Sequence, residues 1–153
     1  MYFRRPGLTV VMDVMYLQPI YRKISHKYCI VALDGFSRYA SVILLKNLRA
    51  ENVVPKVDEF LRDNIFRYEK VFTDSGVEFV SKKMRELYKK YEISWYTNPS
   101  PHKTSICERF IQTLKRKMVR YISHFNREDV TSVIHKLVMR YNSKDHAGLM
   151  NEQ

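Results

Sequence analysis

The chain has 153 residues, and 27 Lys and Arg against 16 Asp and Glu give it a formal net charge of +11. With 45% hydrophobic and 13% aromatic residues but only 4 Gly and 5 Pro, it can bury a core, which excludes a disordered or collagen-like chain. The excess of positive charge favours a polyanionic partner, either nucleic acid or an anionic membrane surface. We expect a single domain over residues 1–153.

Cysteine usage and hydropathy narrow the class further. Cys29 and Cys107 are too few and too far apart for a disulfide scaffold or a paired-cysteine metal site. We therefore expect reduced thiols and a cytosolic or nuclear compartment. No apolar run approaches the ~20 residues that a membrane-spanning helix requires, so we expect no membrane segment.

The first 45 residues have the composition of three strands. Residues 8–17 have the pattern of a strand whose successive side chains point to opposite faces. One face would carry Val10, Met12 and Val14, and the other would carry Val11, Asp13 and Met15. Residues 27–34 and 39–45 form two more apolar runs, and residues 35–38 between them are few enough for an antiparallel hairpin. These three stretches predict an antiparallel meander.

Helical and extended segments then alternate along the rest of the chain. Apolar spacing predicts a helix around residues 53–61, a short strand at 71–73, a helix from Ser81 and another strand at 93–96. Residues 98–101 interrupt regular structure, and we expect a helix to begin at Ser105 or Ile106. A last helix is expected from Arg127 to about Asn142, with Asn126 as its N-cap. This order predicts an α/β fold with a five-stranded mixed sheet, three antiparallel strands plus two parallel ones, flanked by helices.

Three carboxylates stand out as candidate metal ligands. Asp13 lies inside an apolar strand, where an ionised carboxylate costs several kcal/mol unless something compensates it. Asp74 follows a buried strand at a Ser-Gly turn, and Glu108 is expected in the first turn of the helix after the Pro-rich segment. Such oxygen ligands suit Mg²⁺ or Mn²⁺.

Each carboxylate also has a structural explanation. Asp13 could lie on a solvated edge, Asp74 could cap a turn, and the helix macrodipole alone favours Glu108 near a helix N-terminus. Two rivals exist: Asp34 is better explained as an acceptor of backbone N–H groups in its tight turn, whereas Glu78 lies just after the Asp74 turn.

Four segments resemble one protein family. Residues 73–79 (TDSGVEF) resemble the TD(N/S)GxEF motif of retroviral-type integrase catalytic cores, and residues 103–115 resemble their KxSxxERFxxTLK motif. Residues 33–40 are similar to the DxFSRY hairpin of that family, and Tyr141-Asn142 with His146 resembles its closing YN…H motif. The amino-acid sequences of these motifs are most similar to those of integrases from Maverick/Polinton elements.

The resemblance implies an RNase H-like fold and a catalytic, metal-binding triad of Asp13, Asp74 and Glu108 that holds two Mg²⁺ or Mn²⁺ ions. It implies 3′-end processing and strand transfer of transposon or viral DNA into target DNA, a homodimer or higher homo-oligomer, and action in the nucleus after cytoplasmic synthesis. Because flanking zinc-binding and β-barrel modules are not recognisable, we expect the chain to be the catalytic core of a longer protein.

Two departures from the family pattern concern the site. Asp74 and Glu108 are separated by 33 residues, slightly fewer than is usual in the family, and residues 98–104 could absorb the difference. Ile111 stands where many relatives carry Asn, which removes a polar contact beside Glu108.

The helix after Glu108 supplies the candidate DNA contacts. Gln112 and Lys115 share a helical stripe with Glu108, and Lys103 and Arg116 add positive charge nearby. These four residues would position a DNA end through its phosphates without reading its sequence. A solvated basic face explains Arg116, Lys117 and Arg120 equally well. For Trp95, a buried strand position is favoured over stacking on a base. A second basic cluster is interpreted as a general electrostatic surface: Lys82, Lys83, Arg85, Lys89 and Lys90.

Two other functions stay open. The chain could be a catalytically inactive, integrase-derived module for DNA binding or assembly, or an RNase H-like nuclease acting on RNA–DNA hybrids. Both share the fold and the basic surface, so only an assay of the chemistry separates them.

Overall fold

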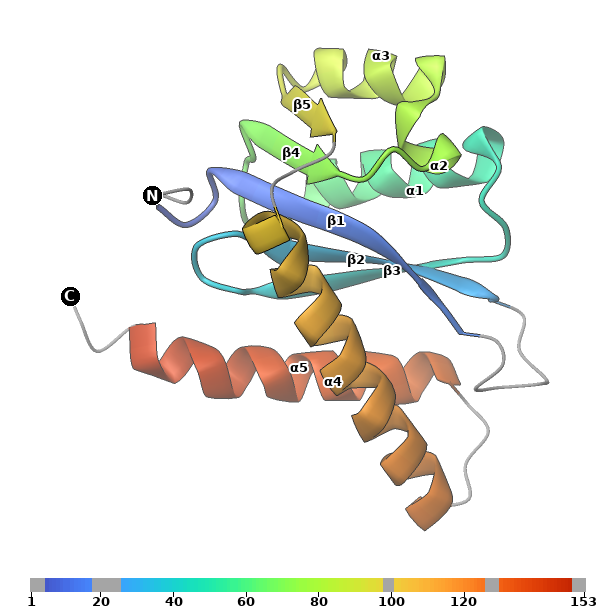
Figure 1. Ribbon diagram of the computed structural model, residues 1–153, viewed down its shortest axis with the longest axis vertical. Helices are drawn as coiled ribbons and strands as arrows, with labels where there is room; N and C mark the ends of the chain where they lie inside the picture. The colour runs from blue at the N-terminus through green and yellow to red at the C-terminus, as the bar shows by residue number, and fades with distance from the viewer. Residues whose placement is uncertain (1–4, 18–25, 98–100, 126–129, 150–153) are drawn as a thin grey trace.

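A five-stranded sheet forms the centre of the computed structural model, which describes residues 5–17, 26–97, 101–125 and 130–149 (Figure 1). The strands are β1 (Thr9–Tyr16), β2 (Tyr28–Asp34), β3 (Ala40–Leu45), β4 (Lys70–Thr73) and β5 (Ser94–Thr97). They lie in the order β3-β2-β1-β4-β5. Strands β1, β2 and β3 pair antiparallel, while β4 is parallel to β1 and β5 is parallel to β4. The predicted mixed sheet is therefore confirmed.

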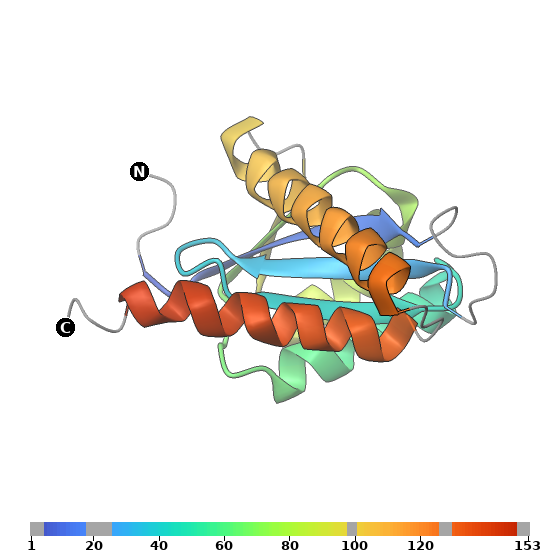
Figure 2. The same ribbon diagram turned by 90° about the horizontal axis from the view of Figure 1, so that it is seen from below.

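In the part of the chain that the structure describes, five helices surround the sheet: α1 (Ala50–Asp63), α2 (Val77–Val80), α3 (Lys82–Lys90), α4 (Pro101–Phe125) and α5 (Val130–Leu149). Helices α1, α2 and α3 lie on one side of the sheet, and α4 and α5 cross each other on the opposite side (Figures 1 and 2). None of the described helices combines the length and the apolarity of a membrane-spanning segment.

Each face of β1 belongs to a separate hydrophobic core, as its alternation predicts. Val11 and Met15 pack with α4 and α5 through residues such as Leu114. Val10 and Met12 pack with α1 and α3 on the other face. A strand buried on both faces fits the centre of a sheet with helices on both sides.

The start of α4 differs from the prediction. The helix begins at Pro101 instead of Ser105 or Ile106. Proline is favoured at the first helical position, because its missing N–H would have no partner there and its φ is already helical. Glu108 consequently lies about two turns inside the helix and not in its first turn. Residues 101–104 are helical, so they do not form the expected loop, and residues 98–100 lie outside the described part.

Other helix boundaries show local causes. Helix α3 starts where predicted, because the Ser81 hydroxyl accepts a hydrogen bond from the Met84 N–H at 3.2 Å. The short helix α2 was not predicted, since four residues carry no measurable periodicity. Helix α5 continues to Leu149, beyond the predicted end at Asn142. Its expected start at Arg127 and N-cap Asn126 lie outside the described residues.

Candidate active site

The pairing of β1 with β4 places the two aspartates side by side. The last parallel partners are Val11 and Phe72, so continuing the register by two residues sets Asp13 beside Asp74. Both positions then share the sheet face that Val11 and Phe72 present to α4. Asp13 is half-buried and Asp74 is exposed, which puts them at the rim of that core.

Helix α4 brings Glu108 to the same rim. Ile106, Cys107 and Phe110 are buried against the sheet, and the Cys107 thiol lies 3.4 Å from the carbonyl oxygen of Val11. That contact fixes the next residue, Glu108, beside β1. One cavity of about 90 Å³ is lined by all three carboxylates together with neighbouring residues of β1, β4 and α4: Val11, Met12, Asp13, Thr73, Asp74, Cys107 and Glu108.

Asp13 carries the electrostatic signature of a crowded carboxylate. Burial raises the pKa of the Asp13 carboxyl, its hydrogen bond from the Val14 N–H at 2.8 Å opposes this, and repulsion from Asp74, Glu108 and Glu78 raises the pKa further. Among the described residues, no cation is one of these influences. The site thus has a surplus of negative charge that a bound cation would relieve.

The turn after β4 holds Asp74 in place. The Gly76 N–H donates a hydrogen bond of 2.9 Å to Asp74 Oδ1. A side chain at Gly76 would meet the carboxylates of both Asp74, at 2.9 Å, and Glu78. A β-carbon here would therefore require the Asp74 or Glu78 side chain to shift.

The end of β4 is also anchored to β5, which the sequence did not reveal. Trp95 Nε1 donates to Thr73 Oγ1 at 2.9 Å, and the same hydroxyl donates to the Asp74 carbonyl oxygen at 2.9 Å. Trp95 stacks on Tyr88 at 6.1 Å between ring centroids and is half-buried, so the strand interpretation of Trp95 is the one the structure supports. A threonine directly before the aspartate is the one signal that could have indicated this support.

The donor set fits a divalent cation in its chemistry. Three carboxylates from β1, β4 and α4 face one small cavity, and hard cations such as Mg²⁺ prefer oxygen ligands. Within the described residues, no three His, Cys, Asp or Glu side chains are already arranged as a metal site. Glu108 is exposed and makes no hydrogen bond or ion pair with the residues that the structure describes, so its carboxylate is free to turn.

Asp34, one of the two rival carboxylates, and the Cys107 thiol are explained without a catalytic role, whereas Glu78 stays close enough to repel Asp13. Asp34 is fully buried and accepts hydrogen bonds of 2.7 Å from the N–H groups of Gly7 and Ser37 and from the Ser37 hydroxyl, as its turn position predicts. Burial raises the pKa of the Cys107 thiol, which keeps it protonated and unreactive. Cys107 and Cys29 are both free and buried.

The predicted DNA contacts lie along α4. Gln112 and Arg116 are exposed and Lys115 is half-buried, on the helix that carries Glu108. The side chain of Lys103 lies outside the described part. Ile111 is half-buried against the core between α4 and α5, so an apolar contact occupies the position where an Asn was expected from the resemblance.

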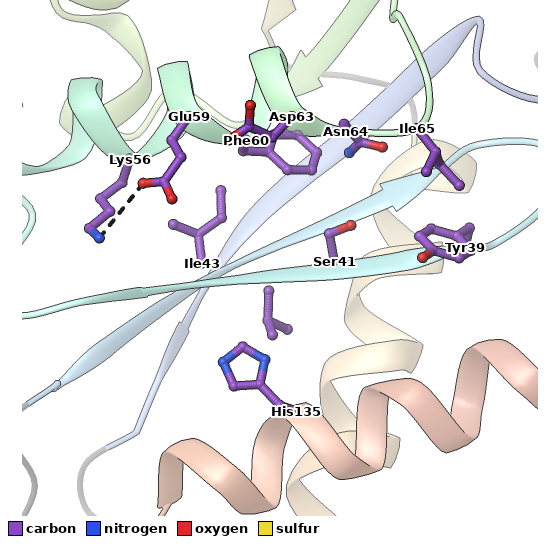
Figure 3. A pocket seen from close by; sticks show the side chains of 11 residues that line it. Tyr39, Ser41, Ile43, Lys56, Glu59, Phe60, Asp63, Asn64, Ile65 and His135 are labelled. Atoms are coloured by element: carbon purple, nitrogen blue, oxygen red, sulfur yellow. Dashed lines mark ion pairs between the residues drawn. The ribbon is translucent and has the colours of Figure 1, made fainter.

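A second hollow lies at the outer edge of β3, away from the carboxylates. Its volume is about 480 Å³, and Figure 3 shows α1 side chains on one side of β3 and His135 of α5 on the other. Lys56 and Glu59 pair there at 3.9 Å. Although this hollow is larger, its described lining has two carboxylates, Glu59 and Asp63, together with Lys56, whereas the smaller cavity has three carboxylates, so we assign the chemistry to the smaller cavity.

The closing motif acts as a clamp that sequence reasoning did not derive. Asn142 Oδ1 accepts from the Ala40 N–H at 2.8 Å, and Asn142 Nδ2 donates to the Ala40 carbonyl oxygen at 2.9 Å. Tyr141 packs edge-on against Phe110, with ring centroids 4.7 Å apart. This motif therefore ties α5 to the edge strand and to α4. The side chain of His146 lies outside the described part.

The mixed sheet, with helices on both faces and carboxylates where β1 and β4 meet α4, is an RNase H-like fold. The sequence model of the integrase core domain matches residues 4–103, and the chain belongs to that family. The matched range includes Asp13 and Asp74 and ends before Glu108.

Relatives and solved structures are consistent with this assignment. An uncharacterized transposon-derived protein of Caenorhabditis elegans is 23% identical over 122 residues, covering 80% of this chain and 43% of the relative, so the chain spans less than half of that protein's length. The catalytic core domain of HTLV-2 integrase was solved in complex with magnesium in a dimeric form. It gives a TM-score of 0.71 at 21% identity, and the match covers 87% of this chain and 84% of the HTLV-2 chain.

Two further solved structures share the fold. A chain of the simian T-cell lymphotropic virus intasome in complex with the PP2A regulatory subunit B56 gamma gives a TM-score of 0.77 at 18% identity, covering 90% of this chain and 50% of its own. The catalytic core domain of BIV integrase gives a TM-score of 0.70 at 17% identity, and the match covers 86% of this chain and 81% of the BIV chain.

Proposed function

We propose that this integrase core domain is a metal-dependent polynucleotidyl transferase that processes the 3′ ends of transposon or viral DNA and transfers them into target DNA. The observation that carries the proposal is the convergence of Asp13, Asp74 and Glu108 on one cavity of about 90 Å³. Three separate segments contribute these carboxylates, and none of the described residues that line the cavity with them is basic. Such a site suits cations that act on a phosphodiester.

In this proposal Asp13, Asp74 and Glu108 hold two Mg²⁺ or Mn²⁺ ions. When bound, such a pair of ions activates the attacking water or 3′-hydroxyl and stabilises the leaving oxygen. The chain's own part is to orient the carboxylates: the Gly76 N–H donates a hydrogen bond to Asp74, and the Val14 N–H donates one to Asp13. The HTLV-2 core solved with magnesium supports the choice of ion.

DNA would lie along α4. Lys103, Gln112, Lys115 and Arg116 would contact phosphates and set the position of the DNA end relative to the carboxylates. A Lys or Arg near a phosphate gains free energy by releasing condensed counterions, and such contacts do not depend on sequence. Support comes from the placement of Gln112 and Lys115 on the helical stripe of Glu108.

Several companion features belong to the same proposal. Residues 1–153 would act as the catalytic core domain, in a homodimer or higher homo-oligomer, on nuclear DNA after synthesis in the cytoplasm. Origin from a Maverick/Polinton-type element is part of the proposal, supported by the wording of the motifs at residues 73–79 and 103–115. A transposon-derived relative agrees with a mobile-element origin in general.

The experiment uses labelled duplex oligonucleotides that mimic element ends, incubated with the protein and Mn²⁺. Shortened 3′ ends and strand-transfer products are expected from the wild-type protein and from Glu86→Gln, a control that removes one exposed carboxylate on α3. No product is expected from Asp13→Asn, Asp74→Asn or Glu108→Gln. Equal product from Asp13→Asn and the wild type would refute the metal triad.

Two outcomes would replace the proposal with another function. Duplex binding without any product would identify a catalytically inactive DNA-binding or assembly module. Cleavage of RNA–DNA hybrids without strand transfer would identify an RNase H-like nuclease.

A further inference from the structure

The crossing of α4 and α5 encloses a second groove, of about 330 Å³, that the proposed reaction does not use. Helix α4 lines it with Lys117, Arg120 and His124, and helix α5 lines it with Arg140 and Lys144. The half-buried Tyr121 and the buried Leu137 complete its lining. We call this hollow the basic groove.

The basic side chains reach the groove because of their helical spacing. Lys117, Arg120 and His124 follow one another at i, i+3 and i+7, which places them on one face of α4. Arg140 and Lys144 are spaced at i and i+4 on α5 and so also share one face. Figure 1 shows α4 crossing α5, and residues of both faces line the same groove.

Among the described residues, no negative charge compensates the cations of the groove. None of the described lining residues carries a carboxylate. Within the described residues, Lys117, Arg120, Arg140 and Lys144 form no ion pair or hydrogen bond, and each is exposed. Four like charges around one hollow repel one another, and a polyanion would reverse that cost.

The helix macrodipole does not explain the four permanent cations. A favourable interaction with the C-terminal end of a helix is confined to the last turn. Lys117 and Arg120 precede the last turn of α4, which ends at Phe125, and Lys144 precedes the last turn of α5, which ends at Leu149. Since no described residue compensates these cations, a polyanionic partner is the source of compensation that we consider.

The basic groove is separate from the carboxylate cavity. The two share no lining residue. Lys117 is nine residues and His124 is sixteen residues beyond Glu108, which corresponds to ~14–24 Å along the helix axis. A ligand in the groove therefore contacts a different part of the protein from a DNA end at the carboxylates.

We propose that the basic groove binds the phosphodiester backbone of double-stranded DNA, as a second contact outside the active site. Among the described lining residues, no Trp or Phe is present and Tyr121 is half-buried, so apart from the imidazole of His124 the groove offers little surface for stacking unpaired bases. Membrane-surface binding requires an apolar helix face to insert beside the charges. Here the apolar faces are used in the core, as with Met118 of α4 and Val133 of α5.

The test is DNA binding in EDTA, so that it does not depend on metal or on catalysis and its failure is distinct from failure of the proposed reaction. Fluorescence anisotropy would follow a labelled duplex titrated with the wild-type protein, with Arg120→Gln/Arg140→Gln and with the matched control Lys82→Gln/Lys83→Gln. The control removes the same charge from exposed, unpaired positions on α3. Circular dichroism would confirm that each variant is folded.

The size of the effect follows from counterion release. Each lost phosphate contact makes the slope of log K against log salt concentration shallower by ~0.9, so the groove variant should lose ~1.8 in slope and bind roughly 60-fold more weakly at 0.1 M salt. The control should change affinity by much less. Equal losses in the groove variant and the control would overturn the proposal, because the effect would then be one of net charge.

Lysine footprinting of the wild-type protein tests the proposal without any variant. DNA should protect Lys117 and Lys144 from acetylation and leave Lys82 and Lys83 reactive. Unprotected Lys117 and Lys144 at saturating duplex would refute the site. Binding to phosphatidylserine vesicles that is lost in the groove variant, with duplex affinity unchanged, would show a membrane ligand instead and would equally overturn it.

Discussion

Asn142 allows a direct test of how α5 is held on the sheet. Its side-chain amide accepts from the Ala40 N–H at 2.8 Å and donates to the Ala40 carbonyl oxygen at 2.9 Å. Ala40 is only 2% exposed and begins the edge strand β3. Replacing Asn142 with Ala leaves both backbone groups of a buried residue without these partners.

The expected loss of stability follows from those two groups. An unsatisfied buried donor or acceptor costs ~1–3 kcal/mol. Because an edge strand admits some water, we expect Asn142→Ala to lower the free energy of unfolding by about 2–4 kcal/mol. Asn142→Asp keeps the shape but sets a carboxylate oxygen against the Ala40 carbonyl, so we expect it to destabilise as well.

The assay is urea unfolding at 25 °C, followed by far-UV circular dichroism. The matched control is Ser143→Ala, because the Ser143 hydroxyl donates only to the Met139 carbonyl within α5. That exposed change should stay within ~0.5 kcal/mol of the wild type. If Asn142→Ala is as stable as Ser143→Ala, the clamp does not hold α5 to β3 and the reasoning fails.

Two further predictions concern carboxylates outside the cavity. Asp34→Asn should lower the free energy of unfolding by ~1.5–3 kcal/mol in urea unfolding, because a charge-assisted hydrogen bond from Ser37 is lost; an unchanged midpoint would contradict this. The hydrogen bond from the Tyr91 hydroxyl, with a smaller effect of Lys90, holds the pKa of the Asp58 carboxyl below its usual value. The stability that this lowered pKa contributes to the folded state is present above the pKa of an unfolded aspartate, ~3.9, and is lost as the pH falls through the lowered pKa. Tyr91→Phe should therefore be less stable than the wild type at pH 7, and the difference should disappear in acid; a difference independent of pH would argue against it.

Local pattern was enough to predict most of the fold. The alternation of β1 assigned Val11 and Met12 to opposite cores, and the short hairpin gave the antiparallel pairing, because both depend on neighbouring residues. The buried turn role of Asp34 was predictable for the same reason. The predicted start of α4 is wrong, because proline was expected to interrupt regular structure at residues 98–101, whereas Pro101 occupies the first position of the helix.

The features that could not be predicted depend on residues distant in sequence. Asn142 and Ala40 are 102 positions apart, so the motif identified the residue but not its partner. Arg120 and Arg140 each have the pattern of a solvated face, and only the crossing of α4 and α5 places them at one groove. The candidate triad was predicted from the family resemblance together with the chemistry of carboxylates, because the spacing of these residues in the sequence does not determine whether they lie close together in space.

The central claim is that Asp13, Asp74 and Glu108 form one divalent-metal site. Anomalous diffraction from crystals grown with Mn²⁺ tests it most directly, because the scattering locates the ions without reference to activity. The account predicts anomalous peaks bounded by these three carboxylates, and their loss in crystals of Asp74→Asn. Mn²⁺ peaks elsewhere on the protein, with none at this cavity, would contradict it.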